Sequence, residues 1–171
     1  MKLSMTSFVK VALIAALYST VSLVLAPFSF GNIQVRVAEG LTLLPLLSPL
    51  PILGLTLGCF ITNFIGVVMG VNILGMMDVF IGTIATLIAA VLTYYFRNIK
   101  IKGFPLLSTL MPIVINAIII GAELAYVFAP EFTFTYFLIF ALEVGIGQTI
   151  AVYLVGLPIL NALKKRNISL D

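Results

Sequence analysis

Four carboxylates stand within or at the ends of long apolar stretches, where an ionised side chain is costly. They are Glu39, Asp78, Glu123 and Glu143. A charged side chain at the centre of a membrane helix costs about 2.5–3.5 kcal/mol on insertion scales, so each needs a partner, a cavity or a function. Carboxylates accept hydrogen bonds and attract cations. The four residues therefore predict an acidic, outward-facing cavity that binds a small solute.

Helical spacing places further polar and aromatic groups beside two of these carboxylates. Asn116, Ile120 and Glu123 follow at steps of four and three, so one helix face presents an amide and a carboxylate to one pocket. A second stripe on one helix face consists of Tyr136, Phe140, Glu143 and Gly147. It places aromatic surface above a carboxylate, an arrangement that suits a flat heteroaromatic ligand. Gln148 lies about 140° from Glu143 around an ideal helix, so it faces that cavity only if the helix is distorted.

Each of these polar residues also has a structural interpretation. Asp78 stands near a predicted helix N-terminus, where it can interact with the helix dipole. Glu39 can pair with Arg36 at the membrane surface, and Asn116 can tie two membrane helices together. Glu123 and Glu143 have no sequence-local cation, which favours a binding role for them.

The residue inventory argues against catalysis. The chain contains no histidine, which is the commonest general base and the commonest transition-metal ligand, so we expect no metal site and no enzyme activity. Its single cysteine, Cys59, stands in an apolar run and is expected to be a small packing residue. No GxxxxGK[ST] phosphate loop is present, and we expect no cofactor.

The elements that must position these residues are membrane helices. Of 171 residues, 62% are hydrophobic and 9% charged, with a mean hydropathy of +1.26, so lipid is the expected solvent. Residues 1–171 are predicted to form a single all-α membrane domain, a compact bundle of six transmembrane helices at residues 7–26, 37–48, 51–71, 76–96, 105–128 and 134–163. The second is short and contains Pro45, so we expect it to be tilted, kinked or partly re-entrant.

Basic residues set the expected orientation. Eight of the nine fall on one side of a six-span topology and only Arg36 on the other, so both termini are predicted to be cytoplasmic in a multi-pass protein of the cell membrane. The eight are Lys2, Lys10, Arg97, Lys100, Lys102, Lys164, Lys165 and Arg166. The last three are expected to anchor the chain at an anionic membrane surface, and we expect no nucleic-acid partner.

Small residues recur at four-residue spacing, which permits close helix contact. The pairs are Ala12 and Ala16, Gly54 and Gly58, and Gly66 and Gly70. For the glycines we expect packing within this chain.

Several segments resemble the queuosine-precursor transporter family, QueT. They are RVAEGLTLLPLL from Arg36, DVFIGTIATLIAAVLTYY from Asp78, PIVINAIIIGAEL from Pro112 and GQTIAVYLVGLP from Gly147, which together extend over most of the chain. The resemblance implies a six-helix substrate-binding component of an energy-coupling factor transporter, which captures a micronutrient outside. Its implied partners are a transmembrane coupling subunit, met by the small-residue face with Ala12 and Ala16, and two cytoplasmic ATPase subunits.

The same resemblance implies the substrate class and the binding residues. The substrate would be a 7-deazaguanine, in its aminomethyl or cyano form, or queuine. The binding role maps to Glu39, Asp78, Asn116 and Glu123; where Gly-Glu is expected, this chain has Gly147 and Gln148, so Gln148 and the nearby Glu143 complete the candidate set. Alternatives are the same kind of transporter with another vitamin-like heterocycle, and an independent secondary transporter or channel with a proton relay.

Overall fold

The computed structural model describes residues 4–30, 35–167 and 170, and within these residues all regular structure is helical. The α-helices are α1 (Met5–Val24), α2 (Ala26–Ser29), α3 (Leu50–Val68), α4 (Met76–Tyr95), α5 (Leu106–Phe128), α6 (Phe134–Ile150) and α7 (Leu157–Lys165). A 3₁₀ helix, η1 (Val37–Leu46), lies between α2 and α3, and a π-helical segment, η2 (Ala151–Gly156), joins α6 to α7. The predicted all-α class is confirmed for the described residues.

Five segments are long and apolar enough to cross a membrane. They are α1, α3, α4, α5 and the continuous run Phe134–Lys165 made by α6, η2 and α7. Their bounds differ by only a few residues from five of the six predicted spans. The protein is therefore a membrane protein with several apolar spanning helices.

The second predicted span differs from the other five. Residues 37–46 form a 3₁₀ helix of 10 residues with Pro45 inside it. At about 2.0 Å per residue this helix is about 20 Å long, which is shorter than the ~30 Å hydrocarbon core. The expected departure from a regular α-helix is present, but a count of six full spans is not confirmed.

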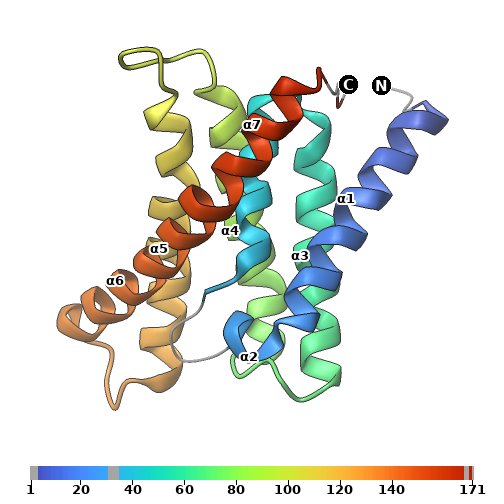
Figure 1. The fold of residues 1–171 in the computed structure, drawn as a ribbon. Coiled ribbons are helices and arrows are strands. Elements are labelled where there is room, and N and C mark those ends of the chain that lie inside the picture. The colour runs from blue at the N-terminus through green and yellow to red at the C-terminus, as the bar shows by residue number, and fades with distance from the viewer. Residues whose placement is uncertain (1–3, 31–34, 168–169, 171) are drawn as a thin grey trace.

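Figure 1 shows that α1 begins and α7 ends at the same end of the molecule, and the loop between α4 and α5 lies at that end too. This loop carries Arg97, Lys100 and Lys102, and Lys164 and Lys165 stand in the last turn of α7. The arrangement is compatible with both ends of the chain on one side of a membrane. That this side is cytoplasmic stays a prediction, and Lys2 lies outside the described residues.

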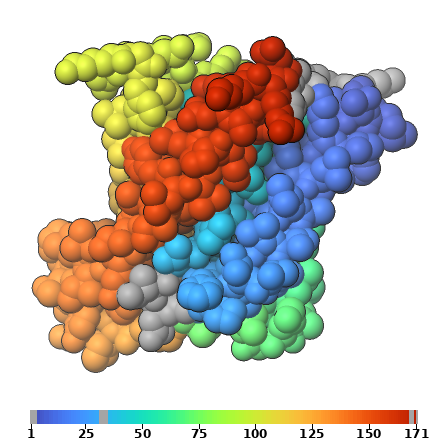
Figure 2. Space-filling view, viewed as in Figure 1, coloured from blue at the N-terminus to red at the C-terminus, as the bar shows by residue number. Residues whose placement is uncertain are grey.

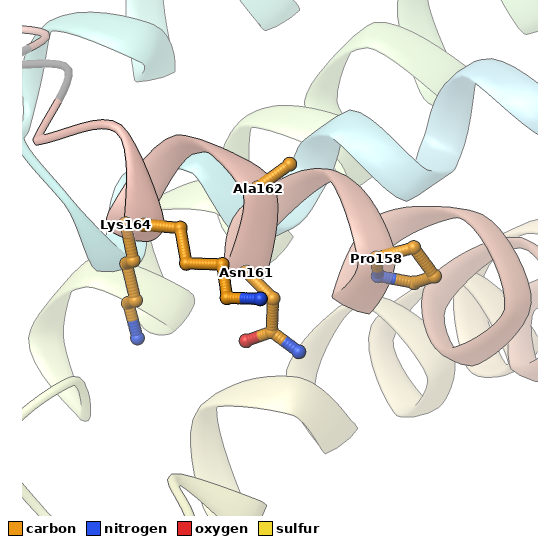
Figure 3. A pocket seen from close by; sticks show the side chains of 5 residues that line it. Pro158, Asn161, Ala162 and Lys164 are labelled. Atoms are coloured by element: carbon orange, nitrogen blue, oxygen red, sulfur yellow. The ribbon is translucent and has the colours of Figure 1, made fainter.

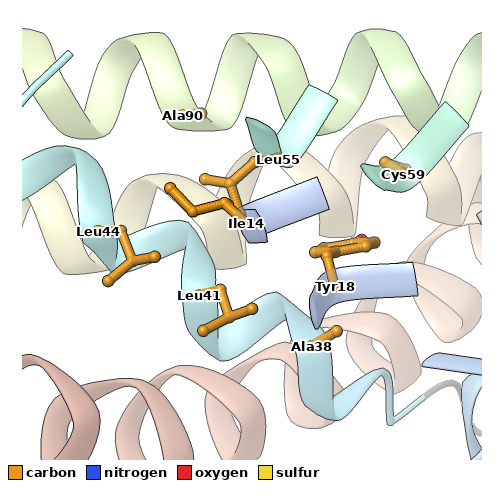
Figure 4. Packing of buried hydrophobic residues seen from close by; sticks show 8 residues of the cluster. All are labelled: Ile14, Tyr18, Ala38, Leu41, Leu44, Leu55, Cys59 and Ala90. Carbon is orange, nitrogen blue, oxygen red and sulfur yellow. The ribbon is translucent and has the colours of Figure 1, made fainter. Parts of the chain in front are cut away.

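Glycines bring α1 and α3 into close contact. A Cβ atom added at Gly54 would lie 2.8 Å from Cβ of Ile14, and one added at Gly58 would lie 2.9 Å from Cβ of Tyr18. Such distances are too short for real Cβ contacts, so only glycine permits this helix separation. The predicted packing role of this glycine pair is confirmed, and its result is a fully buried Tyr18 among the apolar residues of Figure 4.

A second glycine contact holds η1 against η2. A Cβ atom at Gly40 would lie 2.7 Å from the carbonyl oxygen of Ala151, so the two backbones touch here. The π-helical turn occurs just before Pro158, which cannot donate the helical hydrogen bond to Leu154. In Figure 2, α6 and α7 pass across this face of the molecule and leave only a narrow strip of η1 visible. The segment η1 is thus enclosed by the long helices.

Candidate functional site

A buried ion pair joins the start of η1 to α4. Nη2 of Arg36 lies 3.6 Å from Oδ2 of Asp78, and these side chains are 8% and 1% exposed. Nδ2 of Asn72 donates to the same Oδ2 at 2.9 Å, and Nδ2 of Asn63 donates to the backbone carbonyl of Asp78 at 2.8 Å. Because both ions are buried and further hydrogen bonds hold Asp78, this pair costs far more to break than a surface pair.

One expectation about Arg36 is corrected by this arrangement. In one interpretation Arg36 paired with Glu39 at the membrane surface. Instead it is buried, and in the described structure its ion pair is with Asp78. The reason is that the Glu39 carboxylate is directed toward hydroxyl donors on α1 and α4.

Glu39 lies in the first turn of η1 and is 2% exposed. The Tyr18 hydroxyl of α1 donates to Oε1 of Glu39, and Oγ1 of Thr86 on α4 lies 3.5 Å from the same oxygen. The other oxygen, Oε2, is buried without a hydrogen-bond partner among the described residues. One carboxylate oxygen is therefore held in place while the other stays available.

A small cavity lies where η1, α4, α5 and α6 meet. Its volume is about 10 Å³, which is about the space of one water molecule. The residues that line it are Arg36, Glu39, Asp78, Gly82, Thr86, Asn116, Ile120 and Gln148. Four of the six predicted binding residues therefore line one cavity, although they come from four separate elements.

Unpartnered buried polar atoms gather at and near this cavity. In the described structure they include Oε2 of Glu39, Oε1 of Gln148, Nε of Arg36 and both carboxylate oxygens of Glu123. A buried polar atom without a hydrogen bond costs about 1–3 kcal/mol. These atoms form a set of mostly acceptors, complementary to a ligand that carries several N–H donors.

The predicted face of α5 is only partly in the cavity. Asn116 and Ile120 line it, and Nδ2 of Asn116 also donates to the Pro112 carbonyl at 2.9 Å. Glu123 is 3% exposed and lies about one turn beyond Ile120, outside the cavity lining. It interacts electrostatically with Asp78 and Arg36, so it belongs to the same charged cluster.

The predicted stripe on α6 is not part of the cavity. Glu143 is half-buried and does not line it, and Tyr136 is 37% exposed. The buried face of α6 consists of Val144, Gly147 and Gln148, at steps of three and one; Val144 packs in a cluster with residues of α5, and Gln148 lines the cavity. Gln148, not Glu143, therefore contributes the α6 side chain to the cavity.

Several site residues were not predicted. Gly82 and Thr86 follow Asp78 at steps of four, so the sequence carries a recognisable signal for them. Cys59 is fully buried, as expected, but its sulfur lies 3.3 Å from Oγ1 of Thr86 and 3.6 Å from Nδ2 of Asn63. It is thus a member of the polar network as well as a packing residue. For Tyr18, the sequence shows only a phenolic hydroxyl within an apolar span, and nothing in it indicates a role in the site.

Wider hollows lie away from the carboxylates. One is an apolar groove of about 500 Å³ that runs between α1 and α3, and the exposed Ala12 and Ala16 line it. Another hollow, of about 770 Å³, follows α7 (Figure 3) and is lined by Pro158, Asn161, Ala162, Lys164 and Lys165. Neither contains a carboxylate, so neither offers the acceptors of the small cavity.

One comparison with known proteins, the match to a family model, agrees with the sequence resemblance. The model of the QueT transporter family matches residues 8–165. No curated protein and no solved structure matches the chain.

Proposed function

The chain belongs to the QueT transporter family, and we propose that it is the substrate-binding component of an energy-coupling factor importer for a 7-deazaguanine precursor of queuosine. This component supplies specificity, and its partner subunits hydrolyse ATP. The cavity between η1, α4, α5 and α6 is the substrate site in this proposal.

One observation carries the substrate assignment. Oε2 of Glu39 and Oε1 of Gln148 are buried acceptors without a partner among the described residues, and both residues line the same cavity. The guanine-like edge of a deazaguanine carries adjacent N–H donors, which such acceptors can satisfy, and the Asn116 amide complements the ring carbonyl. The Ile120 side chain and the methylene of Gly82 offer apolar surface to the ring faces.

Substrate binding in this proposal requires a change of shape. A cavity of about 10 Å³ holds about one water molecule, so a bicyclic ring enters only when at least one wall moves. The short η1 is the wall whose beginning is held by two contacts, the ion pair of Arg36 with Asp78 and the hydrogen bond from Tyr18 to Glu39. Ligand donors that replace these contacts provide the energy for opening.

The substrate assignment is tested by calorimetry on the purified protein in detergent. The ligands are 7-aminomethyl-7-deazaguanine, 7-cyano-7-deazaguanine, queuine and guanine. We expect tight binding of at least one deazaguanine and weaker binding of guanine. If the folded protein binds none of them, the substrate proposal is refuted.

The partner assignment uses the groove between α1 and α3. Ala12 and Ala16 are exposed there, and small residues allow another membrane helix to approach closely. Ala12→Trp should leave ligand binding intact and reduce ATP-dependent uptake by the complex with the coupling and ATPase subunits. The matched control is Leu13→Trp, because Leu13 is 64% exposed but does not line the groove. Equal uptake by the two variants would contradict a docking role for this groove.

A further inference from the structure

The helix α5 and the run α6–η2–α7 touch at one end and diverge toward the other. A Cβ atom added at Gly121 of α5 would lie 2.6 Å from Cα of Ala141 on α6, so the two backbones are in contact there. Toward the beginning of α5, a whole tyrosine side chain is needed to bridge the two segments, and the hydroxyls of Thr109 and Tyr153 lie 3.2 Å apart. The segments therefore form a wedge that opens toward the end of the molecule where α7 ends (Figure 1).

This wedge contains an apolar groove of about 430 Å³ between α5 and α6. The groove is lined by aliphatic side chains, which include Ile113, Val114 and Ile118 of α5 and Leu142, Ile146 and Ile150 of α6. Thr149 also lines it, but its hydroxyl donates to the Gly145 carbonyl at 2.7 Å and so offers the groove no free donor. A groove of this composition fits a hydrocarbon chain and not a polar solute.

The groove and the hollow along α7 lie on one face of the same helical run. Thr149 lines the groove, and Tyr153 follows it at a step of four. In the π-helical η2 the hydrogen-bonding interval lengthens to five residues, which brings Pro158 onto this face. Asn161 and Lys165 follow at steps of three and four, and they line the hollow with Pro158. The π-helical turn thus keeps the apolar groove in line with the hollow.

The wide end of the wedge is basic. Lys164 and Lys165 line the hollow and stand in the last turn of α7. In Figure 3, the side chains of Asn161 and Lys164 extend from the same side of α7. The α4–α5 loop with Lys100 and Lys102 lies at this end of the molecule too (Figure 1). Basic residues at a membrane surface attract anionic lipid headgroups.

The depth of the groove corresponds to one leaflet of a bilayer. Val114 and Ile118 stand 8 and 12 residues after Leu106, the first residue of α5, so the groove lies about 12–18 Å from that end of the helix. Half of a bilayer, with its headgroup region, is about 20–22 Å thick. A phospholipid whose phosphate lies at the lysines therefore extends its acyl chain as far as the groove.

From the shared face, the charge and this depth, we infer that the wedge between α5 and α6–η2–α7 binds one anionic phospholipid. Its phosphate contacts Lys164 and Lys165, Asn161 donates a hydrogen bond to the headgroup, and an acyl chain fills the apolar groove. A zwitterionic lipid has the same chain, but its headgroup brings a cation close to the lysines and is attracted less. The inference is independent of the proposed substrate and requires only that the chain lies in a membrane.

Fluorescence quenching tests the position of this lipid. The chain contains no tryptophan, so a single introduced tryptophan reports only on its own surroundings. Val114→Trp places one at the groove, in vesicles of phosphatidylcholine with a minor share of brominated phosphatidylglycerol or brominated phosphatidylcholine. Brominated chains quench the tryptophan on contact. We expect phosphatidylglycerol to bind here about 5- to 30-fold more tightly, because each basic residue near a membrane surface strengthens the attraction of an anionic lipid about fivefold.

The matched control is Leu87→Trp on α4. Leu87 is 37% exposed, stands 8 residues before Tyr95 at the end of α4, and lines neither the groove nor the hollow. Its depth is therefore similar to that of Val114, which stands 8 residues from the end of α5. The two brominated lipids should quench Leu87→Trp about equally.

Charge variants test the headgroup contact. In the Val114→Trp protein, Lys164→Gln combined with Lys165→Gln should reduce the preference for phosphatidylglycerol to about one. Lys100→Gln combined with Lys102→Gln removes the same charge from the α4–α5 loop, and most of the preference should remain. An equal loss in both double variants would overturn the inference, because it would assign the preference to the whole basic surface and not to the hollow.

Two further results would overturn the inference. One is quenching of Val114→Trp by neither lipid, which would mean that another protein segment covers the groove. The other comes from native mass spectrometry of wild-type protein mixed with equal amounts of phosphatidylglycerol and phosphatidylcholine. We expect one retained phosphatidylglycerol molecule. Equal retention of the two lipids would refute the anionic site even if none of the variants folds.

Discussion

Alanine at position 82 should damage the site although it adds only one methyl group. Gly82 lines the cavity on α4, and a Cβ atom there would lie 2.7 Å from Nδ2 of Asn63 and even closer to Oδ1 of Asp78. Neither side chain is free to retreat. Arg36 and Asn72 hold Asp78, and the Asn63 amide is bonded to the Asp78 backbone.

The size of the effect follows from these contacts. Adding a methyl group to a well-packed interior typically costs about 1–3 kcal/mol. The unliganded variant can relieve the strain by displacing Asp78. Ligand binding then has to restore the original position of Asp78, so the free energy of binding becomes less favourable by this amount. At 1.4 kcal/mol per factor of ten, the affinity should fall by about 5- to 150-fold. A harmful effect of this substitution is opposite to the usual one, because Gly→Ala inside a helix normally stabilises the helix by about 1 kcal/mol.

Calorimetric titration with the best-binding deazaguanine measures this loss, and thermal unfolding in detergent shows whether the variant is folded. The matched control is Gly145→Ala on α6. An added Cβ atom there would lie 3.7 Å from Cβ of Ala117, its nearest neighbour, which is an ordinary van der Waals distance. The control should bind like wild type and unfold at the same temperature or higher. If Gly82→Ala binds as tightly as Gly145→Ala, the inferred rigidity of the cluster around Asp78 is refuted.

Three further variants or measurements test the rest of the structure. Tyr18→Phe removes the hydroxyl that donates to the Glu39 carboxylate, so it should weaken ligand binding about tenfold or more in calorimetry. The control Tyr95→Phe, at a 73% exposed position, should bind the ligand like wild type. Cys59 is fully buried, so a maleimide should label it slowly in the folded protein and completely after denaturation; fast labelling of folded protein would contradict its position. Gly156→Ala should lower the thermal midpoint, because the new Cβ would meet the Gly40 carbonyl oxygen at 2.5 Å, and an unchanged midpoint would argue against this backbone contact.

The long helices could be predicted from the sequence because hydropathy and length act along a single segment. Five predicted spans correspond to long helices, with ends near prolines, glycines and charged residues. The conformation of residues 37–46 depends on a partner distant in sequence, since Gly40 packs against the backbone of η2. Pro45 indicated that this segment is irregular, but the 3₁₀ form needs the surrounding helices to specify it.

Regular spacing also explains which parts of the site could be predicted. Steps of four correctly placed Asn116 and Ile120 on one face, and the same rule applied to Asp78 would have added Gly82 and Thr86. No spacing rule connects residues on different helices. The contacts of Tyr18 with Glu39 and of Arg36 with Asp78 span 21 and 42 positions, and only the packed fold brings them together.

The choice between Glu143 and Gln148 shows why charge alone misleads inside a membrane protein. A carboxylate was favoured because burial of a charge demands a function, but Glu143 is only half-buried and so avoids much of that cost. The neutral Gln148 pays less to be fully buried, and its amide can both donate and accept. A cluster that already contains Glu39, Asp78 and Glu123 against one buried arginine has little capacity for a fourth negative charge. The amide at position 148 therefore adds an acceptor to the cavity without adding to the repulsion among its carboxylates.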